Sequence, residues 1–240
     1  MHVDAAIFDD DNTPLNDGAE VRRARLGAAL TLFRDFTLKY QYDFVDEGRV
    51  LDASLTYEGL EPLEIEIGQF KEPFSLEEMT SSNNITFMER ALPNEFAGGY
   101  NTGIAVSTHG ANWSAAGGLF GDRIIKDVFG AGDEDLSVTG RFTYAPLHEE
   151  NRVWYLGVSA SRREVDEGGR VRFATDPESA VAEVNLVSTA LYGTSNSITW
   201  VAWKRRTSKV LFRSRVNTFT ARSIGKAVAA ISTSPGGTPI

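Results

Sequence analysis

The chain has 240 residues, a net charge of -9 at pH 7 and no cysteine. Without cysteine, disulfide frameworks, thiolate metal sites and cysteine nucleophiles are excluded. The charge changes abruptly along the chain, because all 33 acidic residues lie at or before Glu183, whereas the residues from Asn185 onward include 8 Lys+Arg and no side-chain carboxylate. An acidic part and a basic tail of different composition therefore share one chain.

The first residues, MHVDAAIFDDDN, lack a basic segment followed by an apolar core, so no signal peptide is predicted in this chain. No run approaches the roughly 18 consecutive apolar residues of a membrane helix. These observations favour a soluble protein, unless the chain crosses a membrane as β-strands, whose signal per segment is much weaker.

Alternation of side chains predicts a series of antiparallel strands. In residues 36–44, FTLKYQYDF, apolar and aromatic side chains alternate with polar ones, as expected where successive side chains point to opposite faces. A tight turn at Arg34 and Asp35 joins this segment to a strand predicted over 20–33, which makes the two an antiparallel hairpin. The same pattern predicts strands at 3–8, 49–59, 63–70, 101–110, 111–122, 136–146 and 151–164, and weaker ones at 171–176 and 180–187.

About ten strands of roughly 7–11 residues with alternately short and long connections are typical of an outer-membrane barrel. Soluble β-sandwiches share much of this pattern. Two features favour the membrane barrel. On most strands one face carries apolar side chains and the other carries small, polar or charged ones. The charged face must therefore contact water, whereas a soluble barrel would bury an apolar face inside. Aromatic side chains near the strand ends are also placed to form an interfacial girdle: Tyr40, Tyr42, Phe44, Tyr57, Tyr144 and Trp154.

One long connection, residues 68–94, does not alternate. Its sequence, GQFKEPFSLEEMTSSNNITFMERALPN, spreads apolar residues among polar ones between Pro73 and Pro93. The segment is too long for a hairpin turn, and loops of this length inside a compact β domain are usually functional. We predict that it folds inward and narrows a pore.

Several long segments resemble the phosphate-selective porin family of Gram-negative outer membranes. They are EVRRARLGAALTLFRDFTLKYQYDF, LTYEGLEPLEIEIGQFKEPFSLEEMTSSNNITFMERALPN, TGIAVSTHG and FTYAPLHEENRVWYLGVSASRRE, and the resemblance extends over about residues 3–187. It implies an antiparallel transmembrane β-barrel of about 16 strands that forms a homotrimer in outer-membrane lipid. It also implies passive diffusion of phosphate, pyrophosphate or similar small anions past an inward-folded third loop, with no enzymatic step; we expect no cofactor.

The resemblance predicts that arginines of the first long predicted strand belong to the path of the anion. Arg22 and Arg23, in VRRAR, match the paired arginines that the family places near its narrow zone, and we add Arg25 of the same segment to the predicted path. Guanidinium groups replace the hydration of a passing phosphate with bidentate, charge-assisted hydrogen bonds. On the residues alone, strand arginines are more often simply solvated.

The long loop contributes the other residues of the predicted path. Ser81 and Ser82, in MTSSN, match loop serines whose hydroxyls bind the anion, and Arg90, in FMERAL, matches a further arginine beside the constriction. On the residues alone, Thr-Ser-Ser runs usually cap helices or turns. No metal ligands are predicted.

One position departs from the family. Where well-known members have a lysine three residues before the two serines, this chain has Glu78, beside Glu77. A carboxylate at the narrowest point repels phosphate, which weakens the expectation of phosphate selectivity. Carboxylates predicted on the inward face act in the same direction: Asp43, Asp52, Glu64 and Glu66. The alternative is a general or weakly cation-tolerant porin fragment without channel activity as written.

The sequence divides into a partial porin β-barrel over residues 1–190, with a constriction loop at about 68–98, and an atypical tail over 191–240. Alternation fades after Leu186, and the tail ends without an aromatic-terminated closing strand. We hypothesise that the tail is out of frame or disordered. We therefore expect a fragment of about ten strands to form a curled, unclosed sheet. The unpaired backbone groups at its open edges cannot be satisfied in lipid, so the chain as written should not insert as a working channel.

Other classes of protein find less support. An enzyme is not indicated, because His2, His109 and His148 stand alone and no nucleophile–base spacing or phosphate-cradling glycine loop occurs. A soluble lipocalin-like β-barrel binding module is the best competitor, since eight to ten antiparallel strands enclose a ligand in that class. Nucleic acid is not an expected partner, because only the tail is basic.

Overall fold

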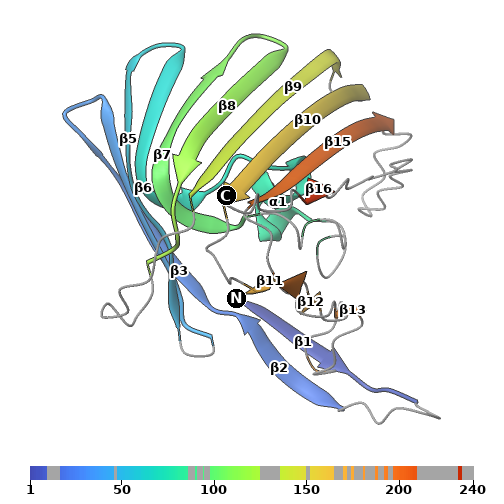
Figure 1. Cartoon of the computed structure of the whole chain (residues 1–240). Helices are drawn as coiled ribbons and strands as arrows, with labels where there is room; N and C mark the ends of the chain where they lie inside the picture. The colour runs from blue at the N-terminus through green and yellow to red at the C-terminus, as the bar shows by residue number, and fades with distance from the viewer. Residues whose placement is uncertain are drawn as a thin grey trace, which may run out of the picture.

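The computed structural model describes residues 1–9, 17–45, 48–85, 90, 94, 98–124, 136–149, 152–164, 170–171, 174–175, 181, 187–188, 192–193, 197–209 and 232–233. These residues form one large curved antiparallel sheet, with the short helix α1 (Leu76–Met79) on its concave side (Figure 1). No helix within these ranges is long and apolar enough to cross a membrane.

The sheet is a meander in which each long strand pairs with the next. Its long strands, in order from one edge, are β3 (Arg25–Leu32), β4 (Phe36–Asp43), β5 (Arg49–Leu60), β6 (Leu63–Lys71), β7 (Tyr100–His109), β8 (Trp113–Phe120), β9 (Ser137–Glu149), β10 (Arg152–Glu164) and β15 (Ser197–Lys209). The two-residue strand β16 (Ser232–Thr233) adds to β15. Among the described residues, the edge strands β3 and β16 do not pair with each other, so the predicted incomplete barrel is confirmed.

Three two-stranded sheets of described residues are separate from this large sheet. The hairpin of β1 (His2–Ala6) and β2 (Gly18–Arg23) extends from one end of it (Figure 1). The remaining pairs are β11 (Arg170–Val171) with β14 (Tyr192–Gly193), and β12 (Ala174–Thr175) with β13 (Val187–Ser188). The segment 171–176, predicted as one weak strand, is therefore split between two short ones, and most of the segment 180–187 lies outside the described residues.

The strand predicted over 20–33 is interrupted at Ala24, and its two parts, β2 and β3, belong to different sheets. The partner strand β4 ends at Asp43, whose carboxylate accepts hydrogen bonds from the Ala24 backbone nitrogen (3.0 Å) and from Arg25 Nε (2.8 Å). The β3–β4 ladder therefore stops there, and β2 pairs with β1 instead.

The tail predicted over 191–240 lies largely outside the described residues. Within it, however, Ser197–Lys209 forms β15 and pairs with β10 along its whole length, from Ser197 opposite Glu164 to Lys209 opposite Arg152. This segment is thus a regular strand and not disordered or helical, because β10 offers it a complete ladder of partners. The reading-frame hypothesis stays a prediction.

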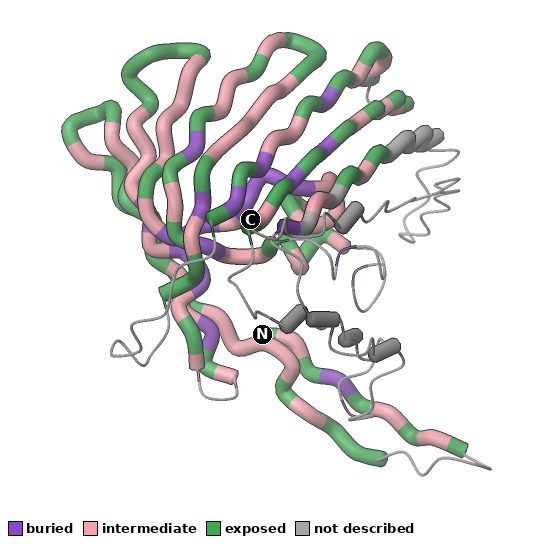
Figure 2. The backbone as a smooth tube through the Cα atoms, in the orientation of Figure 1, coloured by how far each residue is buried: buried purple, intermediate pink, exposed green. Residues whose placement is uncertain are grey.

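The sheet is apolar outside and polar inside, the reverse of a soluble protein. Buried residues gather where the strands pass the loop between β6 and β7 (Figure 2), and many are polar: Asp43, Asp52, Ser54, Asn101, Ser137, Thr139, Thr143, Ser159, Ser161 and Ser197. Many large apolar or aromatic side chains on the strands are exposed: Leu26, Leu30, Leu38, Tyr40, Ile67, Ile104, Val106, Leu119, Val138, Phe142, Tyr144, Trp154, Leu156, Val158, Val201 and Trp203. This is the burial pattern expected of a wall with lipid outside and water inside.

One small apolar cluster lies on the inner face at the end of β6. Phe70 and Phe120 pack edge to face with ring centroids 5.3 Å apart, beside Ala105. Gly118 makes room for them, since a Cβ there would lie 2.8 Å from both the Phe120 ring and the Ala105 methyl group. The cluster fixes the position from which the chain leaves the sheet after Lys71.

Candidate functional site

The constriction loop, predicted at about 68–98, runs from residue 72 to residue 99 between β6 and β7. Ser75 caps α1 by accepting a hydrogen bond from the Glu77 backbone nitrogen, and its own backbone nitrogen donates to Ser159 Oγ on β10 (3.1 Å). Ser81 caps the short 3-10 helix η1 (Ser82–Asn84). The loop therefore lies against the inner face of the wall, as the pore hypothesis requires.

A cavity of about 370 Å³ lies between this loop and the strands β1 to β7. Its lining includes the hydroxyl groups of Ser81 and Ser82, two carboxylates (Asp52 and Glu66) and five cationic side chains: Arg23, Arg25, Lys39, Lys71 and Arg90. Among the described residues of the lining, cations thus outnumber carboxylates. In the described part of the chain, no group of three or more His, Asp or Glu side chains is placed to hold a metal ion.

Two ion pairs on the wall make this asymmetry stronger. Lys39 Nζ lies 2.8 Å from Asp52 Oδ1, and the lysine side chain is 49% exposed whereas the aspartate side chain is 4% exposed. Arg25 and Asp43 form a similar pair in which the arginine is again the more exposed partner. In both pairs the carboxylate side chain is 4% exposed, and the cation is the more exposed partner.

The structure brings most of the predicted site residues together and separates one. Arg23, Arg25, Ser81, Ser82 and Arg90 all line the cavity. Arg22 does not, because neighbouring residues of a strand point to opposite faces. Instead, its guanidinium forms an ion pair of 2.5 Å with Asp4 on β1.

The family can be assigned from the sequence. The family described as "Phosphate-selective porin O and P" matches residues 1–192. The chain belongs to this family. It is 32% identical to Porin O of Pseudomonas aeruginosa over 166 residues, which are 63% of this chain and 36% of that protein. An uncharacterized protein of Caulobacter vibrioides is 31% identical over 174 residues, or 66% of this chain and 34% of that protein. The chain spans about a third of the length of these relatives.

The two acidic residues predicted to oppose anions lie in different surroundings. Glu78, the departure from the family pattern, is held between two cations: its carboxylate is 2.7 Å from Lys71 Nζ and 3.4 Å from Arg90 Nε. Its charge is therefore compensated within the loop. Neither Glu78 nor Glu77 lines the cavity, and the Glu77 carbonyl accepts a hydrogen bond from Arg90 Nε (3.0 Å).

Sequence reasoning missed two important residues at the end of β6. Alternation puts Lys71 on the apolar face with Ile65 and Ile67, yet it lines the cavity, 5.2 Å from the centre of the Tyr100 ring. The alternation rule fails there because the strand ends at Lys71. Glu72 was missed because no local pattern marks it; its partners are 29 to 91 residues away.

Proposed function

We propose that the protein is an outer-membrane porin through which small anions, such as phosphate and pyrophosphate, diffuse passively past the constriction loop. The observation that carries this proposal is the asymmetry of the ion pairs at the cavity. The cations Lys39 and Arg25 line the cavity and are the more exposed partners, whereas the side chains of Asp52 and Asp43 are almost fully buried. The name of the Pseudomonas aeruginosa relative, Porin O, agrees with a pore.

The proposed passage requires no chemical step. A hydrated anion that reaches the cavity exchanges part of its water shell for guanidinium and ammonium groups, and the serine hydroxyls of the loop donate further hydrogen bonds. Because Lys71 and Arg90 already share Glu78, their hold on the anion is weaker than that of free cations. Such moderate binding suits a pore, since an ion must leave as readily as it enters.

The outer surface supports the membrane location in this proposal. Its exposed leucine, isoleucine, valine and aromatic side chains would contact outer-membrane lipid, as on the outside of other barrels of this type. The homotrimer implied by the family resemblance is part of the same proposal. A lipocalin-like soluble binder fits less well, because that class needs its apolar face inside the barrel.

A second candidate function is weakly selective passage of small solutes of either charge. It is favoured by Asp52 and Glu66, which line the same cavity as the cations. The two candidates differ in the reversal potential under a salt gradient, which is displaced toward that of the anion for an anion pore and lies near zero for weakly selective passage, so one measurement separates them.

The test uses the full-length protein purified from outer membranes and reconstituted in a planar lipid bilayer. Under a KCl gradient, the reversal potential should show a preference for chloride, and added phosphate should reduce the chloride current by competing for the cations. A preference for potassium would overturn the anion proposal. A reversal potential near zero without competition by phosphate would favour weakly selective passage.

A further inference from the structure

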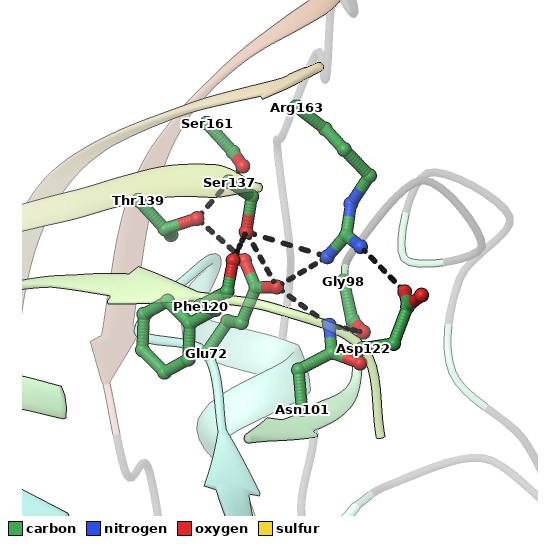
Figure 3. Close-up of polar contacts among 9 residues, drawn as sticks. All are labelled: Glu72, Gly98, Asn101, Phe120, Asp122, Ser137, Thr139, Ser161 and Arg163. Atoms are coloured by element: carbon green, nitrogen blue, oxygen red, sulfur yellow. Dashed lines mark hydrogen bonds and ion pairs between the residues drawn. The ribbon is translucent and has the colours of Figure 1, made fainter. Parts of the chain in front are cut away.

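Glu72, the first residue of the constriction loop, is a buried carboxylate outside the cavity. Its side chain has no exposed surface. Figure 3 shows its two oxygens surrounded by hydrogen-bond donors from three strands. These donors are Asn101 Nδ2 on β7 (2.6 Å), Ser137 Oγ (3.1 Å) and Thr139 Oγ1 (2.5 Å) on β9, and Arg163 Nη2 on β10 (2.6 Å).

This arrangement satisfies the carboxylate almost completely. A buried charge is tolerated only when it is paired and hydrogen-bonded, and Glu72 has one cation and three neutral donors. The cation is itself held, because Arg163 also donates to Ser137 Oγ (3.3 Å) and lies 3.5 Å from Asp122. We call Glu72, Asn101, Ser137, Thr139 and Arg163 the latch.

The latch also joins the two ends of the loop. The Glu72 backbone nitrogen donates to the Gly99 carbonyl (2.9 Å), and Asn101 Nδ2 donates to the Gly98 carbonyl (2.8 Å). Gly98 packs directly on the carboxylate, since a Cβ there would lie 2.5 Å from the Glu72 carboxyl carbon. Both ends of the loop are therefore fixed at one point of the wall.

We propose that Glu72 is a positioning residue that sets the width of the passage. The latch holds the loop against β9 and β10, and the loop in turn carries Ser81, Ser82 and Arg90 to the cavity. Without the Glu72 charge, the loop would leave the wall and move within the passage. The proposal rests on the loop narrowing the pore, but it is independent of which ion the pore prefers.

The test compares Glu72→Gln with Glu64→Gln in planar bilayers. Glu64 lies on β6 and accepts a hydrogen bond from Ser107 (3.3 Å), so the control removes an inward carboxylate outside the latch. Glu72→Gln should lose the single steady conductance level of the wild type and give larger, fluctuating currents. Glu64→Gln should keep a steady level. A steady level of wild-type size in Glu72→Gln would overturn the proposal.

A disulfide staple separates loop position from general loss of structure. The Ser75 backbone nitrogen is 3.1 Å from Ser159 Oγ, and the chain has no cysteine, so Ser75→Cys with Ser159→Cys introduces one defined pair. In the Glu72→Gln background, oxidation of this pair should restore the steady level, and a reductant should abolish it again. Currents that keep fluctuating when the staple is closed would contradict a positioning role.

If the Glu72→Gln protein does not reach the membrane, the variant Arg163→Gln tests the same proposal. It removes the cation of the latch but leaves the three neutral donors, so fluctuating currents are again expected, and a steady wild-type level would overturn the proposal. The sign of ion preference is read separately, from the wild-type reversal potential. Either proposal can therefore fail without the other.

Discussion

Two glutamates of the same loop, Glu72 and Glu78, have different surroundings. The Glu72 side chain is fully buried and meets Arg163 from a distant strand. The Glu78 side chain is 13% exposed and meets Lys71, the last residue of β6, and Arg90 in the loop itself. The partners of Glu72 fix the loop to the wall. Those of Glu78 also line the cavity, so we expect Glu78 to adjust the charge that a passing ion would meet. The surroundings of a carboxylate, and not its presence in the loop, decide whether it anchors the loop or tunes the charge.

The largest effect that tests this comparison is on stability. Glu72→Ala should lower the free energy of unfolding by about 3–5 kcal/mol, because it leaves the Arg163 cation in a buried site without its main partner. Glu78→Ala should cost less, about 2 kcal/mol, since Lys71 and Arg90 keep backbone carbonyl partners. Urea unfolding of the detergent-solubilised protein measures both. Equal losses in the two variants would remove the distinction between the glutamates.

An intermediate effect is expected on ion preference at the cavity. Glu78→Gln removes a negative charge beside two cations and should raise the ratio of anion to cation permeability by about two- to fivefold, as expected for a unit charge a few ångströms from the path in water. Lys71→Gln should lower the ratio by a similar factor. Reversal potentials in a KCl gradient measure both shifts, and shifts of the same sign in the two variants would contradict charge tuning by this pair.

The smallest expected effect concerns the neighbouring arginines of β2. Arg23→Gln should reduce anion preference by about twofold, because Arg23 lines the cavity among other cations. Arg22→Gln should leave the reversal potential unchanged, since its guanidinium is paired with Asp4 away from the cavity. The same bilayer recordings apply. A larger shift for Arg22→Gln than for Arg23→Gln would show that the pairing of β2 with β1 differs in the membrane.

Much of the sheet could be predicted from the sequence, because the alternation of apolar and polar residues shows which side chains share a face of a strand. Residues 36–44 alternate so regularly that both the strand and its outward side follow from local order, and Leu38 and Tyr40 are indeed exposed. The loop was recognised because its residues do not alternate. The rule failed where a strand ends or turns away, as at Ala24 and Lys71, because periodicity carries no information about where pairing stops.

By itself, then, the sequence determined the antiparallel wall, its apolar outside, the long loop and the porin family. Only the tertiary structure decided which charges line the cavity. Glu72 meets Thr139 and Arg163 across 67 and 91 residues of chain, and such partners depend on strand register and not on local order. The compensation of Glu78 likewise required Lys71 and Arg90 to converge on it. Local alternation determines which face of a strand a side chain lies on. The partners of a charged side chain depend instead on which strands the fold places side by side.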